Sequence, residues 1–270
     1  MGAAKEIRIG MVGSGFVGKA HSLAFSALPK YLWPPPAMPV RAVIAEATAD
    51  LAEEAARRYG WERAVVGWEK VVADPEVDVV DIAVPDNMHA EVALAAAEAG
   101  KHILCEKPMA TSAAEAKRMY EAAQKAGVKH FVGFCYRRAP AVLLAKRLIE
   151  EGRIGEIQSC RVFFHMDWLC DASVPLLWRL KKETGGAGVV GDTGSHSIDY
   201  ARFIAGEIAE VCADVETWIR ERPVAPGSGE MAAVTNPDEV LFLVRFANGA
   251  VGRIESGRAV MGEKHHHGFE

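Results

Sequence analysis

The sequence predicts an α/β protein in two parts: a doubly wound parallel sheet over residues 1–133, and an α+β domain with an open, mostly antiparallel sheet over residues 134–270. Three observations lead to this prediction. Short apolar runs alternate with helical segments in the first half, as expected for successive strand–helix–strand crossovers. A glycine-rich turn directly follows the first apolar run. In the second half longer strand-like segments replace this alternation, and Asn248-Gly249 marks a hairpin between two of them.

The predicted strands of the first half are short apolar runs bounded by glycine, proline or polar turns. The run His102–Cys105, between Gly100 and Pro108, is typical of a buried parallel strand. Glycines close the helices of this half, because they adopt the left-handed conformation at a helix end. The predicted strands are 7–12, 40–45, 77–84, 102–105 and 129–133; the helices run to Leu28 after the first strand, then over 51–59, 88–99 and 112–126.

The turn after the first strand contains the motif Gly13-x-Gly15-x-x-Gly18 and opens a helix. In such a turn the first glycine permits the sharp bend, the second lets the backbone approach a pyrophosphate, and the third allows close packing of helix on strand. The helix N-terminus adds a positive dipole end. The segment therefore predicts a dinucleotide site that includes Phe16 and Val17.

Glu46 follows the predicted strand 40–45. A carboxylate there would accept both hydroxyls of the adenosine ribose and repel a 2′-phosphate, which favours NAD over NADP. The spacing from the glycines exceeds the usual value of about 20 residues, and the proline-rich stretch Pro29–Pro36 accounts for the excess as a loop. The alternative is a solvated glutamate that caps the next helix.

Glu106-Lys107-Pro108 stands where the strand His102–Cys105 stops. Ligands of open α/β sheets bind beyond the carboxyl ends of the strands, so a lysine here can extend its ammonium group into a cleft. Pro108 fixes the turn that presents it. The alternative is a surface Glu–Lys pair at a strand end.

The second half begins with one amphipathic helix over 141–151 and continues in strand-like segments. The sequence predicts strands over 156–165, 209–220, 239–246 and 251–258, and an exposed loop over 223–237.

The glycine-dense stretch Gly185–Asp199 is the chemically richest part of the chain. We expect Asp192 or Thr193 to cap a helix over 194–205, with Asp192, His196 and Asp199 on one face. A carboxylate beside an imidazole can fix its tautomer, which suits a general base near neutral pH. Two alternatives stay open: a metal held by the two carboxylates and the histidine, and a capped helix with a histidine satisfied in the core.

The motifs Gly13-x-Gly15-x-x-Gly18, Glu106-Lys107-Pro108 and Gly191-Asp192-x-Gly194-x-His196-x-x-Asp199, in this order, resemble the Gfo/Idh/MocA oxidoreductase family over essentially the whole chain. The segments 134–141, 166–168 and 178–179 are similar to the branch with inositol and levoglucosan dehydrogenases. The resemblance implies an N-terminal Rossmann domain, a second domain with an open sheet, and NAD(P)-dependent oxidation of a ring hydroxyl.

The resemblance also implies roles for individual residues. The catalytic group would be Lys107, Asp192 and His196: His196 as acid/base, Asp192 orienting it and helping to hold the substrate, and Lys107 stabilising developing alkoxide charge. Further cofactor contacts are expected at Pro85, Asn87, His89, Glu106 and Lys107, and further substrate contacts at Tyr136, Arg137, Asp167, Trp168 and Arg179.

Composition excludes several classes of partner. The net charge is −5 with no basic run, which argues against nucleic acid, and no apolar stretch is long enough to span a bilayer. Five scattered cysteines without CxxC spacing predict reduced thiols in a cytoplasmic protein without disulfides or zinc.

We expect a small polyol or sugar as substrate and self-association into a dimer or tetramer through the open sheet. Because Gly268-Phe269-Glu270 resembles the start of a family strand, we also expect the natural chain to continue past Glu270, with His265, His266 and His267 as ordinary loop or strand residues.

Two other functions remain possible at this point: an NAD-dependent glycosidase, which oxidises its substrate only transiently, and a non-catalytic dinucleotide-binding regulator. Net accumulation of reduced cofactor distinguishes a dehydrogenase from the glycosidase. The presence of Lys107, Asp192 and His196 argues against a regulator, which has no need of a base beside the nicotinamide.

Overall fold

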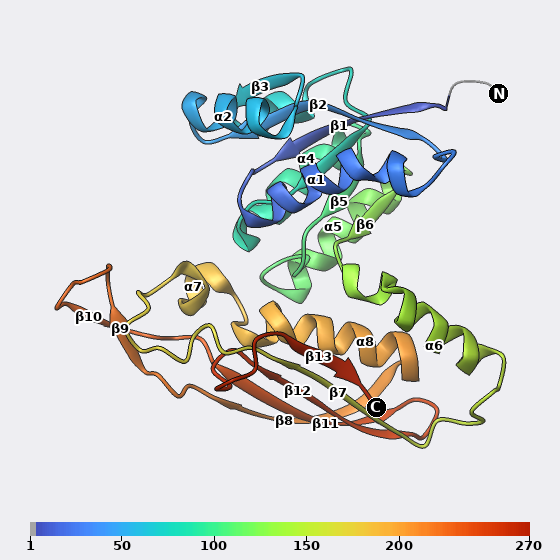
Figure 1. Cartoon of the computed structure of the whole chain (residues 1–270), viewed down its shortest axis with the longest axis vertical. Helices are drawn as coiled ribbons and strands as arrows, with labels where there is room; N and C mark the ends of the chain where they lie inside the picture. Colours follow the sequence, from blue (N-terminus) through green and yellow to red (C-terminus); the bar gives the residue numbers. More distant parts are fainter. Residues whose placement is uncertain (1–3) are drawn as a thin grey trace. The chain divides into compact units, whose positions relative to one another are not determined.

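The computed structural model describes residues 4–270, and the chain divides into two compact units, Met1–Gly133 and Phe134–Glu270. Figure 1 shows an α/β unit in blue to green and a second unit in yellow-green to red. Each unit has its own sheet and its own hydrophobic core.

The first unit contains a six-stranded, all-parallel sheet in the order β3-β2-β1-β4-β5-β6. The strand order reverses between β1 and β4, so the carboxyl ends of these two strands form the crevice in which such sheets bind ligands. The doubly wound fold is therefore confirmed. The strands are β1 (Glu6–Val12), β2 (Met38–Glu46), β3 (Arg63–Val66), β4 (Val79–Ile82), β5 (His102–Cys105) and β6 (His130–Val132).

Local sequence explains where the helices of this unit begin and end. Thr48 and Ser112 accept hydrogen bonds from backbone N–H groups in the first turns of α2 and α5, and Gly60 and Gly127 end these helices in the left-handed conformation. The buried apolar faces pack on the sheet in two clusters. The helices are α1 (Phe16–Tyr31), α2 (Ala49–Tyr59), α3 (Glu69–Val72), the 3₁₀ turn η1 (Asp86–Met88), α4 (His89–Glu98) and α5 (Ala113–Ala126).

Three expectations for this unit need correction. Helix α1 runs through Pro29 to Tyr31, so the loop predicted over Pro29–Pro36 begins later; the N–H of Leu32 still reaches the Leu28 carbonyl and closes the helix. The strand predicted over 77–84 is shorter, Val79–Ile82. The short edge strand β3 and the single-turn helix α3 were not predicted, because segments of four residues carry too little periodicity to be recognised.

The second unit contains a five-stranded sheet in the order β13-β7-β12-β11-β8. The pair β7–β12 is parallel and the other neighbours are antiparallel, which confirms the mostly antiparallel prediction. The Asn248-Gly249 hairpin joins β11 and β12, with Gly249 at φ +91°. The strands are β7 (Ser159–His165), β8 (Ile208–Glu216), β11 (Glu239–Phe246), β12 (Val251–Gly257) and β13 (His266–Phe269).

Helices α6 (Pro140–Glu150) and α8 (Ser195–Ala205) lie on one face of this sheet (Figure 1). Tyr200 and Ile204 of α8 pack against Val162, Val244 and other side chains of the sheet. On the opposite face Val211, Leu243 and Val251 are exposed, and within residues 134–270 no helix covers them.

The tract 223–237, predicted to be an exposed loop, contains strand β10 (Met231–Ala233), which pairs with β9 (Glu221–Pro223). The fully buried Arg222 anchors this hairpin, because its guanidinium donates to the carbonyl oxygens of Leu169 (2.6 Å) and Asp171 (2.7 Å). A three-residue strand with polar neighbours gives no alternating apolar pattern, so the sequence did not reveal it. No helix within residues 4–270 is both long and apolar enough to cross a membrane.

Candidate functional site

The glycine loop between β1 and α1 has the geometry that its motif predicts. Gly13 has φ +95°, and a Cβ there would lie 2.6 Å from the Ala83 carbonyl oxygen. A Cβ on Gly18 would lie 2.1 Å from the Gly13 carbonyl oxygen, so helix and loop can approach closely only at glycine. Gly15 has no atom within 4 Å of its Cβ position, which leaves the backbone open to a ligand.

The N-terminus of α1 is available to an anion. Gly15 is the residue before the helix, and no acidic side chain lies in the first turn. Phe16 is 90% exposed at the helix start, whereas Val17 is half-buried. The free N–H groups and the positive dipole end fit a pyrophosphate.

Glu46 ends β2 and lies beside the glycine loop. Its Oε1 accepts a hydrogen bond from the Ser14 N–H at 2.5 Å. The cap of α2 is Thr48, so the alternative of a helix-capping glutamate does not hold. A carboxylate at this strand end is well placed for ribose hydroxyls.

Glu106 and Lys107 leave β5 with different environments. Glu106 is buried, and its Oε2 accepts the Lys107 N–H at 3.1 Å. A Cβ on Gly133 would lie 2.2 Å from Glu106 Oε1, so a side chain at residue 133 would displace this carboxylate. The buried Glu106 side chain therefore stabilises the backbone of the motif through the Lys107 N–H. The Lys107 side chain is half-buried.

His21 links Glu106 to a second buried carboxylate, a feature not predicted from the sequence. Its Nδ1 lies 3.0 Å from Asp81 Oδ2, and its Nε2 lies 3.3 Å from Glu106 Oε1. Burial alone would lower the pKa of His21, but the hydrogen bonds and charges of the two carboxylates raise it to about 10. The two carboxylates thus favour the protonated form of the His21 imidazole. A lone aspartate within the apolar strand β4 was the available signal.

The turn after β4 carries three predicted cofactor contacts, and the structure places them differently. Pro85 and Asn87 are exposed beyond the carboxyl end of β4. His89 is fully buried, and its two ring nitrogens each lie 2.9 Å from a carbonyl oxygen, those of Val84 and Pro108. His89 therefore braces the two loops from inside and has no exposed atom to offer a cofactor.

In the second unit, Asp192 and His196 lie on consecutive turns of one helical segment. A π-helical turn, η4 (Val190–Gly194), leads directly into α8, and no side chain caps α8. The prediction that Asp192 or Thr193 caps the helix is wrong, because the helical backbone begins before both residues. The Thr193 hydroxyl instead donates to the Val189 carbonyl, four residues earlier.

His196 lies among aromatic rings. It is 6% exposed, and its ring contacts Tyr136 edge-on with a centroid distance of 4.6 Å. Phe134 and Phe164 lie at 5.8 and 6.0 Å. Such walls restrict water around the imidazole and fix its plane.

Asp192 lies beside a buried arginine that sequence reasoning missed. Arg258 is fully buried, and its Nη1 is 3.6 Å from Asp192 Oδ2. Nothing local in the sequence connects the two residues.

Asp199 is paired with an arginine. Arg137 grips its carboxylate with two hydrogen bonds, Nε to Oδ2 at 2.7 Å and Nη2 to Oδ1. The Arg137 guanidinium also lies over the Phe203 ring at 5.1 Å. The two aspartates of the predicted helical face thus pair with different arginines, Asp192 with Arg258 and Asp199 with Arg137. Across residues 4–270, no three potential metal ligands converge.

The remaining substrate candidates of the second unit have contacts of their own. The Tyr136 hydroxyl lies 3.2 Å from His265 Nε2, and Asp167 Oδ2 lies 2.7 Å from Lys264 Nζ. Trp168 is half-buried, and the Arg179 guanidinium stacks over the Trp178 ring at 4.2 Å.

Two family models match the chain. Residues 7–134 match the oxidoreductase family with an NAD-binding Rossmann fold, and residues 142–270 match the Gfo/Idh/MocA C-terminal domain. The chain belongs to the Gfo/Idh/MocA oxidoreductase family. The resemblance inferred from three motifs is confirmed, as is the NAD-binding Rossmann domain.

Characterised relatives belong to the same family branch. The chain is 48% identical over 277 residues to levoglucosan dehydrogenase of Pseudarthrobacter phenanthrenivorans, covering 98% of this chain and 71% of that protein. It is 30% identical to myo-inositol 2-dehydrogenase of Thermotoga maritima, covering 95% of this chain and 70% of that protein. A solved structure of levoglucosan dehydrogenase in complex with NADH and levoglucosan superposes with a TM-score of 0.95 at 50% identity, covering 98% of this chain and 70% of that one.

Proposed function

We propose that this protein is an NAD-dependent dehydrogenase that transfers hydride between the nicotinamide and a ring hydroxyl of a sugar, cyclitol or anhydrosugar. The observation that carries the proposal is the aromatic-walled His196 next to Asp192 on one helical segment, in a chain 48% identical to a levoglucosan dehydrogenase. The anhydrosugar is the substrate class most directly favoured by that identity.

The first unit binds the cofactor in this proposal. The glycine loop and the N-terminus of α1 hold the pyrophosphate. Glu46 accepts hydrogen bonds from the ribose hydroxyls and repels a 2′-phosphate. Bound nicotinamide supplies the acceptor for the hydride. Lys107 donates a hydrogen bond to the substrate hydroxyl and stabilises the developing alkoxide; Glu106 and His89 hold the backbone on either side of it.

The second unit supplies the acid/base group. His196 removes the hydroxyl proton during oxidation and returns it in the reverse direction. Asp192 orients His196 and accepts a hydrogen bond from a substrate hydroxyl. Tyr136, Asp167, Trp168 and Arg179 provide polar and stacking contacts to the ring, whereas Arg137, occupied by Asp199, acts as a support.

A substrate panel tests the function. Levoglucosan, inositols and free sugars are each incubated with NAD and with NADP, and absorbance of the reduced nicotinamide is followed. We expect net accumulation with NAD and at least one anhydrosugar or cyclitol, and none with His196→Ala. Product release without net reduced cofactor would indicate the glycosidase instead. Cofactor binding without turnover of any substrate would indicate the regulator.

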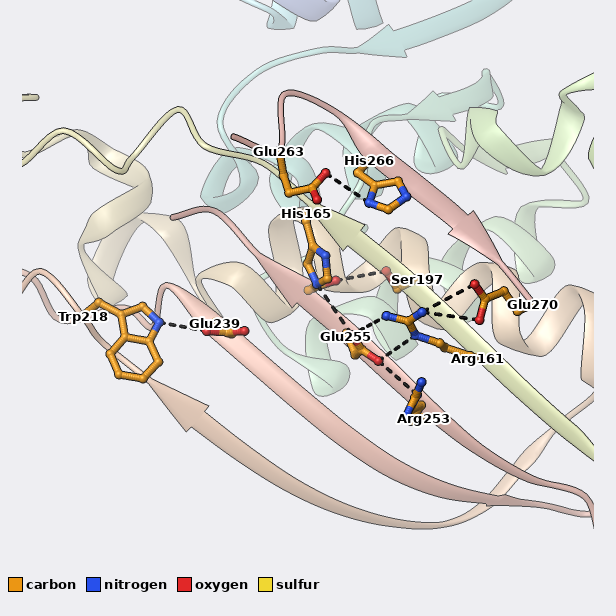
Figure 2. Close-up of polar contacts among 11 residues, drawn as sticks. Arg161, His165, Ser197, Trp218, Glu239, Arg253, Glu255, Glu263, His266 and Glu270 are labelled. Carbon is orange, nitrogen blue, oxygen red and sulfur yellow. Dashed lines mark hydrogen bonds and ion pairs between the residues drawn. The ribbon is translucent and has the colours of Figure 1, made fainter. Parts of the chain in front are cut away.

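We also propose that the protein forms a dimer or tetramer through the uncovered face of the second sheet. Exposed Leu243 and Val251 lie there among ion pairs. Arg161 bridges Glu255 at 2.9 Å and Glu270 at 3.4 Å, and Arg253 also reaches Glu255 (Figure 2). Exposed apolar side chains rimmed by charges suit association.

Light scattering after size exclusion tests the oligomer. Leu243→Asp should shift the protein to monomer. Ile154→Asp is the matched control, because Ile154 is 64% exposed and belongs to the loop between α6 and β7, not to a strand of the sheet. An unchanged mass for Leu243→Asp would refute the proposed surface.

For the site of action we propose the cytoplasm, because the cysteines are odd in number, scattered and free of CxxC spacing. Titration of denatured, unreduced protein from the native host should count five thiols, and a bridge would contradict the proposal.

A further inference from the structure

The carboxylate of Asp192 is approached from the protein interior by Arg258, the residue after β12. Arg258 has no exposed surface, and its Nη1 lies 3.6 Å from Asp192 Oδ2. A fully buried arginine is rare unless its charge is paired with an opposite charge. The acid/base histidine stands one turn further along the same helical segment.

The same guanidinium also holds the backbone on which the Asp192 segment rests. Nη2 of Arg258 donates to the Pro237 carbonyl at 2.8 Å, and the Val189 N–H donates to that same oxygen at 3.3 Å. Gly188, with φ +59°, packs so closely on this stretch that a Cβ would lie 2.8 Å from the Asn236 Cβ and 2.9 Å from Pro237 Cδ. The segment leading to Asp192 therefore rests on residues 236–237.

The charge of Arg258 is retained despite its burial. Burial lowers its pKa, while the charges of Asp192 and Asp238 act in the opposite direction. An arginine guanidinium stays protonated under these conditions, and with little water nearby its attraction for a carboxylate is stronger than at a surface. One oxygen of the Asp238 carboxylate is occupied by the backbone, because Oδ2 accepts hydrogen bonds from the N–H groups of Trp218 and Ile219.

We propose that Arg258 is the positioning residue of Asp192: one nitrogen of its guanidinium forms an ion pair with the carboxylate while the other donates to the Pro237 carbonyl, and this orients Asp192 for the substrate hydroxyl and for His196. This inference rests on the proposed function, since it gives Asp192 a part in the reaction. Arg258 itself has no exposed atom and does not touch the substrate.

Arg222 provides a matched control within the same unit. It is also fully buried, but its guanidinium donates to the carbonyl oxygens of Leu169, Asp171 and Val174. Lysine at either position keeps the positive charge but replaces the planar fork by a single nitrogen, so it does not reproduce the two-nitrogen geometry of the guanidinium. Arg222→Lys therefore measures the cost of replacing a buried guanidinium that contacts carbonyl oxygens and not Asp192.

The experiment compares Arg258→Lys, Arg258→Gln and Arg222→Lys for melting temperature, NADH binding by fluorescence, and kcat and KM with levoglucosan or the best substrate of the panel. We expect Arg258→Lys to lower kcat by about tenfold or more with NADH affinity changed less than about twofold. Arg222→Lys should lower the melting temperature similarly while leaving kcat within about twofold. Equal losses of kcat in the two lysine variants would overturn the proposal. Arg258→Gln provides the comparison where the lysine variant does not fold.

A double-mutant cycle separates positioning from a general structural role. In an Asp192→Asn background, Arg258→Lys should lower kcat by no more than about twofold further, because the interaction it removes is already gone. A full additional loss would refute the mechanism. Crystal structures of the wild type and Arg258→Lys give a readout independent of turnover. If the wild type turns over no substrate, the proposed function fails, but the crystal structures still test the role of Arg258. An Asp192 carboxylate in the same position in the wild type and in Arg258→Lys would refute that role.

Discussion

His267 should make the second unit sensitive to acid. Its ring is stacked between Phe164 and Tyr200, with both centroids at 4.3 Å and interplanar angles of 11° and 14°. Its Nε2 is buried and has no hydrogen-bond partner among the described residues. Burial, helped by the charge of His265, lowers the pKa of His267 to about 4. The folded protein therefore holds this ring neutral.

The pKa difference gives the size of the effect. A histidine with a lowered folded-state pKa contributes its full stability above the unfolded pKa of 6.5, and the contribution is lost as the pH falls towards 4. Linkage with these values predicts that the free energy of unfolding falls by about 2 kcal/mol between pH 7 and pH 5, and by about 3 kcal/mol between pH 7 and pH 4. Other groups add their own pH dependence, so the test must isolate this residue.

Phenylalanine at position 267 retains the stack and removes the titration. In urea unfolding, the free energy of unfolding of His267→Phe relative to the wild type should be about 2 kcal/mol higher at pH 5 than at pH 7. His266→Phe controls for removal of an adjacent histidine, since His266 is 54% exposed and paired with Glu263. If the difference between His267→Phe and the wild type is the same at both pH values, the reasoning is refuted.

Three further predictions concern the site. Lys107→Ala and His196→Ala should each lower kcat by about a hundredfold or more while leaving NADH affinity, measured by fluorescence titration, largely intact; near-normal turnover would remove that residue from the mechanism. Glu46→Ala should reduce the ratio of kcat/KM for NAD over NADP, and an unchanged ratio would contradict its role at the ribose. Asp199→Asn should lower the free energy of unfolding by about 3 kcal/mol, because it leaves the Arg137 guanidinium without its counter-charge; a loss below about 1 kcal/mol in urea unfolding would show that Asp199 contributes little.

Local signals accounted for most of the fold. Strand β5 was predicted to the residue, because Gly100 and Pro108 bound an apolar run too short to be a helix. The hairpin at Asn248-Gly249 was likewise predicted, since its turn type depends on two adjacent residues.

The parts that escaped prediction depend on contacts between residues distant in the chain. His21 meets Asp81 across 60 positions, and Arg258 meets Asp192 across 66; no spacing rule encodes either pair. Helical periodicity predicted that Asp199 shares a face with His196, but it gave no sign of the guanidinium of Arg137, 62 positions away, that binds the Asp199 carboxylate. The motifs pointed to the glycine loop, Lys107 and His196 as candidates, whereas buried charged residues such as His21 and Arg258 became visible only in three dimensions.

The parallel pairing of β7 with β12 has a consequence for the order of assembly during synthesis. Ser159 pairs with Val251, and His165 pairs with Gly257, so β7 leaves the ribosome about ninety residues before its central partner exists. Every strand of the first sheet, in contrast, has been synthesised by Val132. We expect the first unit to become protease-resistant on stalled nascent chains well before the second, whose β7 must wait with its apolar side chains uncovered. Limited proteolysis of chains stalled at increasing lengths measures this order, and simultaneous protection of both units would contradict it.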